Sequence, residues 1–477
     1  MVGDRSARPS VLVAGGGIAA LEAVLALQAL AAERVAVTLL SPAAELVYRP
    51  VTVAEAFGRG QARSFAVDAI LAQLSVPRVR DALVAVDPDA RTVLTAGGDE
   101  LRYDRLLIAT GARSEAMLPG ALTFRGREDV PALQALLTEL VEGTARSVAF
   151  TLPTAQIWSM PIYELAVLTA AHLREHHSPA QVTIVTPEAA PLELFGPEAE
   201  RALRPLLAQL QVAVRASARP AGVRYRELVL AGGGSVVADR VVTLPMLLGP
   251  GILGIPADDR GFIPVDSHGR VAGVPDVFAA GDVTAFPLKQ GGLATQQADA
   301  AAATIARDAG APVDDAPFHP VLRGLLITAG APIYLRCEPQ RLPRQASVAI
   351  DQPRPARART VTASVASDQA LWWPPAKIAG RYLGPYLAGA WTMGLAHAVP
   401  AGQESLADRT PIPGPAVSPP EFQDAVELAL LMADADARWG DYRSALSALD
   451  AAADLAGALP PEYEVKRGQW LAELNRG

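Results

Sequence analysis

The chain has almost no cysteine and almost no lysine. Its 477 residues include one cysteine, Cys337, which excludes an internal disulfide framework, a Cys-x-x-Cys redox pair and a multi-cysteine zinc site. The only lysines are Lys289, Lys377 and Lys466, and every other basic residue is arginine. A GC-rich genome is the ordinary reason for this bias, yet it marks the three lysines for inspection.

Long apolar runs and basic runs are absent as well. No uninterrupted apolar stretch has the length of a membrane helix. The net charge of −8 and the lack of a basic run argue against nucleic acid as a partner. The N-terminus is polar, so we expect no signal peptide. We therefore expect a cytoplasmic protein, or one peripheral at the membrane, with no metal site and enough chain for three or four compact units.

The most informative segment that is present covers residues 11–23. It runs from an apolar stretch through three glycines into a helical pattern, which predicts a strand, a tight turn and a helix. Gly15 permits the turn, Gly17 lets the backbone approach a pyrophosphate, and Ala20 lets the helix pack on the sheet. Phosphates would bind the free N–H groups at the helix start. A glycine-rich turn without a ligand is the alternative.

Two later segments strengthen the dinucleotide interpretation. Residues 277–283 read as a buried strand ending in Gly281-Asp282, and this aspartate either accepts a hydrogen bond from a flavin ribityl hydroxyl or is a plain turn residue. Residues 289–300 read as a helix start, whose positive end could stabilise the anionic reduced flavin ring. Between the glycine segment at 11–23 and the Gly281-Asp282 segment, residues 103–112 form a predicted strand that ends in Ala-Thr-Gly.

In this order, the three motifs resemble the two-dinucleotide-binding-domain flavoproteins of the pyridine nucleotide-disulfide oxidoreductase superfamily. The resemblance covers about residues 9–330 and is strongest to type II NADH dehydrogenases and sulfide:quinone oxidoreductases. It implies an α/β, glutathione-reductase-like fold with two Rossmann-like domains, and FAD bound in the first. The FAD contacts that follow are the phosphate loop, the Ala-Thr-Gly turn, the ribityl contact and the helix start, namely Gly15, Gly17, Ala20, Thr110, Gly111, Gly281, Asp282 and Ala294.

The second strand departs from the family pattern. Relatives often end it with an acidic residue for the adenosine ribose, whereas this chain has Ser41, whose hydroxyl would bind a ribose less strongly. Tyr48-Arg49-Pro50 follows, as in the quinone-reducing branch, where this loop lies near the flavin. Arg49 is therefore also a candidate cofactor contact.

The predicted second dinucleotide domain, residues 116–249, lacks a nucleotide loop. Its first strand, residues 147–152, leads into Pro153–Pro161, which contains no glycine. Prolines remove N–H donors and each Cβ blocks close approach to a pyrophosphate. The next strand also has no terminal acid, although Glu188 follows it. This resembles the sulfide:quinone oxidoreductase branch, so we expect NADH to bind weakly.

Catalytic candidates are few. Sulfide chemistry needs two cysteines beside the flavin, and Cys337 is more readily a buried small apolar residue. In relatives a glutamate at the position of Glu164 reaches toward the flavin, where it could relay a proton to N5 or to a quinone oxygen. Lys289 could stabilise the reduced ring or a bound anion. The alternatives are favourable charge at a helix start for Glu164 and a solvated loop position for Lys289.

The last third of the chain contains an aromatic segment and a tail. Residues 371–386 are rich in tryptophan and tyrosine and form a packed lid, a dimer contact or a membrane contact, of which we favour packing. The tail predicts three helices, residues 421–438, 442–455 and about 462–474, similar to one tetratricopeptide unit or to a docked helical hairpin. The predicted domains are FAD binding (1–115 and 250–317), degenerate NAD(P)-binding-like (116–249), C-terminal interface (318–397), proline-rich linker (398–420) and helical tail (421–477).

Three functions remain open from the sequence. The first is a FAD-dependent oxidoreductase that passes electrons from a small donor to a quinone or a protein electron carrier. The second is an NAD(P)H-dependent reductase that uses the degenerate site. The third is a non-catalytic FAD scaffold whose tail recruits a partner protein. A homodimer is an open alternative for the oligomeric state.

Overall fold

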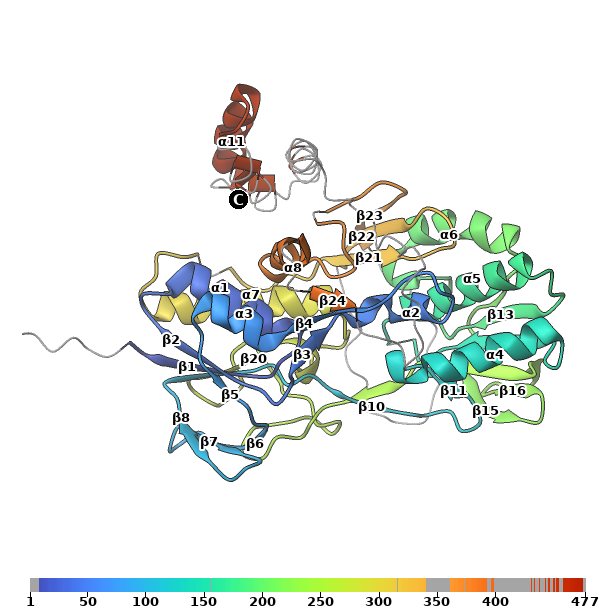
Figure 1. Cartoon of the computed structure of the whole chain (residues 1–477), viewed down its shortest axis with the longest axis horizontal. Coiled ribbons are helices and arrows are strands. Elements are labelled where there is room, and N and C mark those ends of the chain that lie inside the picture. Colours follow the sequence, from blue (N-terminus) through green and yellow to red (C-terminus); the bar gives the residue numbers. More distant parts are fainter. Residues whose placement is uncertain are drawn as a thin grey trace, which may run out of the picture.

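The computed structural model describes residues 8–155, 157–314, 316–339, 361–372, 374–392, 396–398 and 458–474, with single positions between 430 and 453. Two five-stranded sheets organise the body of the molecule (Figure 1). Every neighbouring pair within them is parallel. The α/β class with two Rossmann-like units and further C-terminal elements is confirmed.

The first sheet has the order β20-β9-β1-β2-β5. Its strands are β1 (Ser10–Ala14), β2 (Ala36–Leu40), β5 (Arg78–Val79), β9 (Arg105–Ile108) and β20 (Val277–Ala279). Val11 and Val13 of β1 face helices α1 (Ile18–Ala31) and α7 (Gly291–Asp308), whereas Leu12 and Ala14 face the other side. There the sheet of β6 (Leu83–Asp87), β7 (Thr92–Thr95) and β8 (Glu100–Arg102) packs. Because both faces are covered, β1 is apolar from Val11 to Ala14 instead of alternating.

The second sheet has the order β11-β18-β12-β13-β14. Its strands are β11 (Leu122–Thr123), β12 (Ser147–Thr151), β13 (Gln181–Val185), β14 (Ala213–Arg215) and β18 (Arg240–Thr243), with helices α4 (Val130–Glu142), α5 (Met160–Glu175) and α6 (Pro197–Gln209). A small antiparallel sheet, β15 (Pro220–Arg224), β16 (Glu227–Leu230) and β17 (Ser235–Val237), adjoins it. The antiparallel pair β10 (Arg113–Glu115) and β19 (Met246–Leu248) connects the two units. The chain thus crosses between them twice.

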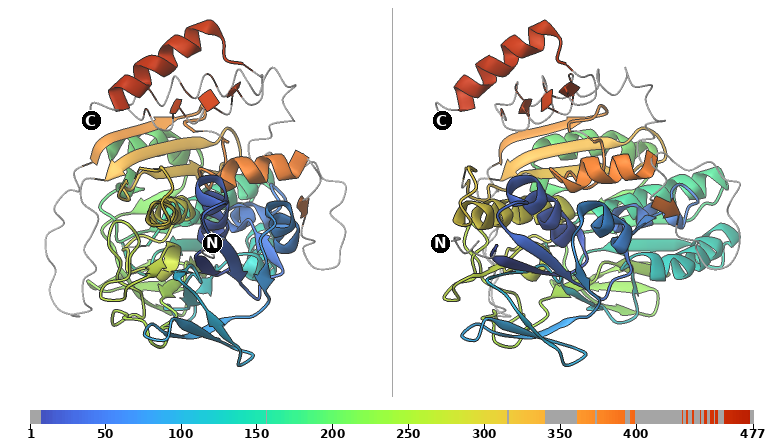
Figure 2. Two further views of the ribbon diagram at one scale, coloured as in Figure 1. Left: turned by 90° about the vertical axis from the view of Figure 1, so that its left-hand side faces the viewer. Right: turned by 60° about the vertical axis from the view of Figure 1, so that its left-hand side comes forward.

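The C-terminal part packs back on both units. Strands β21 (Leu322–Leu326), β22 (Ile333–Pro339) and β23 (Val361–Ser367) form an antiparallel sheet, followed by α8 (Leu383–Thr392) (Figure 2). Strand β24 (Ala396–Ala398) then pairs with β4 (Arg63–Ala66), which also pairs with β3 (Glu45–Val47). Short helices α2 (Thr52–Glu55) and α3 (Val67–Leu74) flank this region.

Part of the aromatic segment is a packed element of the body. Trp372 is buried against Tyr334, with ring centroids 5.2 Å apart, and its Nε1 donates to Ala376 O at 2.8 Å. This supports the favoured packing interpretation at that position, while Trp373 lies outside the described residues.

The tail has a small hydrophobic core of its own. Helix α11 (Pro461–Leu474) matches the predicted third helix, and Trp470 packs with Leu449 and Leu459. Figures 1 and 2 show α11 as an outlying element beyond the β21-β22-β23 sheet. The linker and most of the other two predicted helices lie outside the described residues. In the part of the chain that is described, we find no helix with the length and apolarity needed to cross a bilayer.

Candidate functional site

The turn between β1 and α1 has the geometry of a phosphate loop. Gly15 has φ +138°, its N–H donates to Leu40 O at 2.9 Å, and a Cβ there would lie 2.2 Å from Ala109 O. Only glycine meets both demands. Gly17 is the N-cap of α1, and no described atom lies within 4 Å of the place its Cβ would occupy. The first N–H groups of α1 therefore face open space, which fits a pyrophosphate.

Gly16 fills a role that the sequence did not reveal. A Cβ at Gly16 would come 2.3 Å from Ser41 Oγ, so the missing side chain lets the loop lie directly on the end of β2. Ser41 is buried, and its Oγ accepts the Ala43 N–H at 3.2 Å. The structure thus places Ser41 against the phosphate loop, and its contact with the adenosine ribose stays a prediction.

The turn carrying Asp282 lies where α1 meets α7. Gly281 has φ +81°, and its Cβ would lie 2.9 Å from Ala19 Cβ and 3.4 Å from Ala294 Cβ. Ala294 is buried and supports this turn, as Ala20 is buried under the phosphate loop. The small residues of both helices therefore bring the Gly281-Asp282 turn close to the start of α1.

The Ala-Thr-Gly turn follows β9 beside the phosphate loop. The Thr110 backbone nitrogen lies 3.2 Å from the Cβ position of Gly15, and the Thr110 side chain is exposed. Gly111 has φ +78° and open space around its Cβ position. The predicted FAD contacts of this turn and of the phosphate loop are thus neighbours in space.

A cavity of about 340 Å³ extends from the Asp282 turn to the second unit. The loop before α5, the first residue of α5 and the residue after β18 contribute apolar side chains, namely Trp158, Met160 and Leu244. Its charged lining consists of one acid and five cations, namely Asp282, Arg49, Arg125, Arg260, Lys289 and Lys377. Arg125 is paired with Asp129 at 3.2 Å and Lys377 with Glu164 at 2.6 Å, which leaves three of these cations and one carboxylate. This excess of positive charge favours anionic groups.

Lys289 is a partly buried cation in this cavity. Its Nζ donates to Thr284 O and lies 3.8 Å from the centre of the Phe262 ring. Burial lowers the pKa of Lys289 to about 8, and Asp282 opposes the shift. Burial raises the pKa of Asp282, opposed by Lys289 and Arg49. Of the two alternatives for Lys289, its place in the cavity lining and its partial burial favour a role in the site over a solvated loop position.

Glu164 is hydrogen-bonded to a lysine, Lys377, that the sequence did not assign to the site. Glu164 is fully buried in α5 and is not part of the cavity lining. Lys377 Nζ donates to its two oxygens at 2.6 and 2.7 Å, and the Ile327 N–H donates at 2.7 Å. Burial raises the pKa of Glu164 and lowers that of Lys377, each opposed by the partner's charge. Lys377 lines the cavity, and the scarcity of lysine was the one signal that could have found it.

Glu188, the acid that follows β13, is hydrogen-bonded to protein hydroxyls. Its buried carboxylate accepts from Ser159 Oγ at 2.9 Å, Tyr163 OH at 2.6 Å and Thr186 Oγ1 at 2.9 Å. Burial raises the pKa of Glu188, and these hydroxyls oppose the shift. The acid after β13 is thus directed inward and occupied by protein hydroxyls. It also ties the loop after β12 to the end of β13.

Cys337 is buried, as predicted. Its Sγ donates to Leu194 O at 3.3 Å, and burial raises its pKa to about 12, which disfavours the thiolate. Trp158, which lines the cavity, packs edge-on against Phe195 with centroids 5.6 Å apart. Within the described residues, no group of three His, Cys, Asp or Glu side chains could hold a metal ion.

Comparison with known proteins identifies the family. Residues 9–307 match the family described as pyridine nucleotide-disulphide oxidoreductase. The chain belongs to this family. The protein is a flavin-dependent oxidoreductase with FAD as its cofactor. The open phosphate loop and the small residues beside Gly281 fit this cofactor.

Its relatives differ in what they are named for. An NADH dehydrogenase-like protein of Mycobacterium tuberculosis H37Rv is 28% identical over 229 residues, which is 45% of this chain and 57% of that protein. Human apoptosis-inducing factor 3 is 30% identical over 43% of this chain and 34% of its own length. The sulfide:quinone oxidoreductase of Aquifex aeolicus has TM-score 0.64 and 19% identity, covering 81% of this chain and 91% of that chain. The similarity to the Aquifex aeolicus structure shows that this chain shares its fold.

Proposed function

We propose that this oxidoreductase passes electrons from a small donor other than tightly bound NADH, through FAD, to a quinone or a protein electron carrier. The observation that carries the proposal is the contrast between the two units. The first has an open glycine loop at a helix N-terminus, whereas the second has a loop whose Ser159 is bonded to the buried Glu188. A dinucleotide has neither glycine nor free ribose-binding carboxylate available there.

The charge of the cavity indicates the class of donor. Among the described residues, Arg49, Arg260 and Lys289 line the cavity together with one carboxylate, that of Asp282. Charge-assisted hydrogen bonds from such cations are strongest to anions. The donor that fits is therefore a small anion that approaches between the two units.

The buried pair supplies a proton route. When bound, FAD accepts and releases two electrons, and reduction of a quinone also consumes two protons. In this proposal Lys377 Nζ donates one of these protons into the cavity, and the Glu164 carboxylate stabilises the protonated lysine before the transfer. Because burial raises the pKa of Glu164 and lowers that of Lys377, proton movement between them is less unfavourable than in water.

An NAD(P)H-dependent reductase is the second candidate. Its support is the naming of relatives as NADH dehydrogenase-like and, in Paraburkholderia xenovorans, as the ferredoxin–NAD(+) reductase component of a biphenyl dioxygenase system. Membership of an oxidoreductase family speaks against a purely non-catalytic scaffold. Partner binding through residues 421–477, peripheral membrane contact and a homodimer are further proposals.

Anaerobic titration of the purified holoprotein separates the two candidates. Dithionite first defines complete bleaching of the flavin band, and NADH and a panel of small anionic donors are then compared. We expect NADH to bleach slowly, or only at about millimolar concentration, because backbone phosphate contacts are missing. Fast bleaching at micromolar NADH would favour the second candidate. Reoxidation by a soluble quinone tests the acceptor, and failure with every quinone and dye would support the non-catalytic alternative.

A further inference from the structure

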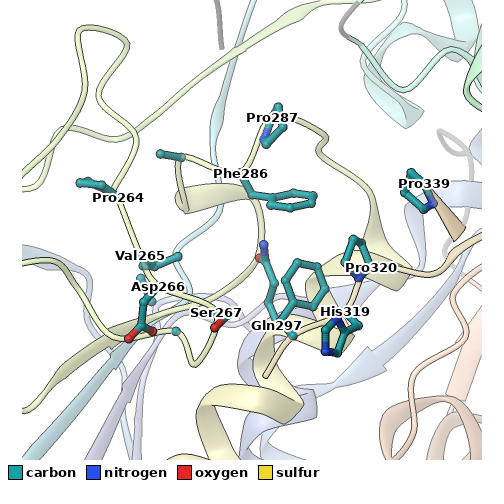
Figure 3. A pocket seen from close by; sticks show the side chains of 14 residues that line it. Pro264, Val265, Asp266, Ser267, Phe286, Pro287, Gln297, His319, Pro320 and Pro339 are labelled. Atoms are coloured by element: carbon teal, nitrogen blue, oxygen red, sulfur yellow. The ribbon is translucent and has the colours of Figure 1, made fainter. Parts of the chain in front are cut away.

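A second cavity, of about 610 Å³, lies against the segment that follows the Asp282 turn. Pro287 lines both this cavity and the flavin-side cavity, so the two share a wall. Figure 3 shows the second cavity from close by. Phe286 and Phe318 form its aromatic side, with centroids 5.1 Å apart in an edge-to-face arrangement. Further lining residues include Pro264, Val265, Pro320 and His319.

Gln297 of α7 presents an unpaired donor to this cavity. Its residue surface is only 6% exposed. Its Oε1 accepts the Gly281 N–H at 2.8 Å and the Thr284 hydroxyl at 3.4 Å. Among the described residues, Nε2 has no acceptor, and Figure 3 shows the amide end directed toward Phe286. The Nε2 donor is therefore available to an acceptor atom on a ligand in the cavity.

The charges of the lining select for a neutral ligand. No lysine or arginine is among the described residues that line the cavity, so an anion has no counter-ion. The one carboxylate, Asp266, already accepts the backbone N–H groups of His268 at 2.8 Å and Arg270 at 2.9 Å. A cation would therefore compete with those bonds. Aromatic walls favour a flat ring over a flexible chain.

We propose that this cavity is a binding site for a neutral, planar ring compound that carries a carbonyl oxygen. The ring packs against Phe286 and Phe318, and the carbonyl accepts a hydrogen bond from Gln297 Nε2. This site is separate from the flavin and donor site, and the inference does not depend on which donor the enzyme uses.

Occupancy of the cavity is linked to the flavin site through Gln297. The same amide group that would bind the ligand holds Gly281, which precedes Asp282. Thr284, which also bonds Gln297, provides the carbonyl that accepts from Lys289. A ligand that fixes the Gln297 amide therefore fixes the turn that bears Asp282 and the anchor of Lys289. By linkage, changes at the flavin alter ligand affinity to the same extent.

The test compares two probes on the holoprotein by calorimetry or saturation-transfer NMR. 2-Acetonaphthone carries the ring and the carbonyl, whereas 2-ethylnaphthalene carries the ring alone. We expect the ketone to bind about fivefold to tenfold more tightly, the effect of one buried hydrogen bond. Saturation with the ketone should also perturb the flavin absorbance band. Equal affinity of the two probes, or no binding of the ketone, would overturn the proposal.

Gln297→Glu is the decisive variant. It keeps an oxygen for the Gly281 N–H but replaces the Nε2 donor by a second acceptor, so ketone affinity should fall by about tenfold. Gln73→Glu makes the same chemical change at an exposed position whose Oε1 accepts from Tyr386 OH, and it should leave ketone affinity unchanged. Unchanged affinity in Gln297→Glu would contradict the site.

Phe318→Ala provides an independent check if Gln297→Glu loses its flavin. Phe318 is only partly buried, and its removal takes away half of the aromatic pair. Ketone affinity should then fall severalfold while the flavin remains bound. Retained ketone affinity in Phe318→Ala would mean that the probe binds elsewhere, and the proposal would fail.

Discussion

Lys377 Nζ lies 2.6 and 2.7 Å from the two carboxylate oxygens of Glu164, across 213 positions of the sequence. The pair joins α5 of the second unit to the segment before α8. The side chain of Glu164 is 0% exposed and that of Lys377 is 10% exposed. This buried ion pair links the second unit to the C-terminal part of the chain, in addition to its proposed role as a proton donor.

The Lys377–Glu164 ion pair should contribute measurably to the free energy of unfolding. Lys377→Met leaves the buried Glu164 without its counter-ion, and we expect the free energy of unfolding to fall by about 3–5 kcal/mol. The double variant Glu164→Gln/Lys377→Met removes both charges and should recover most of this loss. Urea unfolding of the three proteins measures it. A Lys377→Met protein as stable as the wild type would show that the pair contributes little.

Lys289 predicts a stability change at alkaline pH in the flavin-free protein. Burial lowers its pKa from 10.5 to about 8 in the folded state, so between these values the unfolded chain binds more protons at this position. The contribution of Lys289 to the free energy of unfolding must therefore increase from pH 8 to 10.5 and be flat below 8. The difference in the free energy of unfolding between wild type and Lys289→Met, measured across this pH range, isolates the contribution of Lys289.

Bound FAD provides a control for that experiment. A nearby anionic group raises the pKa of a lysine. In the holoprotein the increase in the free energy of unfolding that is due to Lys289 should therefore begin at a higher pH. Parallel pH profiles for wild type and Lys289→Met, with and without FAD, would contradict the assignment of Lys289 to the flavin site.

Two glycines predict separable effects on folding and on cofactor binding. Gly15→Ala places a Cβ 2.2 Å from Ala109 O at positive φ, so both stability and FAD content should fall. Gly17→Ala places a Cβ in open space, so the fold should persist while FAD affinity drops, because the methyl group occupies the approach of the pyrophosphate. The ratio of flavin to protein absorbance and the melting temperature distinguish the two outcomes.

We expect that the helical tail can be removed without loss of FAD binding. Its described core residues, among them Leu449, Leu459 and Trp470, pack with one another and form a cluster separate from those of the body. Ending the chain after Gly414 should therefore preserve FAD binding and change only partner binding or oligomeric state. Flavin content and size-exclusion chromatography give the readout. Loss of flavin, or aggregation, would mean that the tail is an integral part of the core.

Local patterns predicted much of the FAD-binding unit. The strand, turn and helix at residues 10–31 follow from one apolar run and three glycines, and the Gly281-Asp282 turn follows from a strand ending in those residues. Such features depend on neighbours in sequence, which a pattern records. Helix α7 likewise begins within the predicted segment, capped by the Gln290 side chain.

The remaining features depend on contacts over long sequence separations. Nothing local indicates that Lys377 reaches Glu164, or that Glu188 is directed inward by hydroxyls from α5 and the preceding loop. Gln297 has the sequence context of an ordinary helix residue, and only the fold sets its amide between a turn and a cavity. The ribose contact of Ser41 stays a prediction.

Strand order also has a consequence for biosynthesis. Strand β20 completes the first sheet beside β9, and β24 completes the small sheet beside β4, yet both are encoded far downstream of their neighbours. A nascent chain that has reached only residue 250 still lacks the Gly281-Asp282 turn and helix α7. The second unit has all five strands of its sheet by residue 243, so it can assemble on the ribosome while the first unit waits. FAD is therefore captured only after α7 has been synthesised, when the second unit can already have assembled.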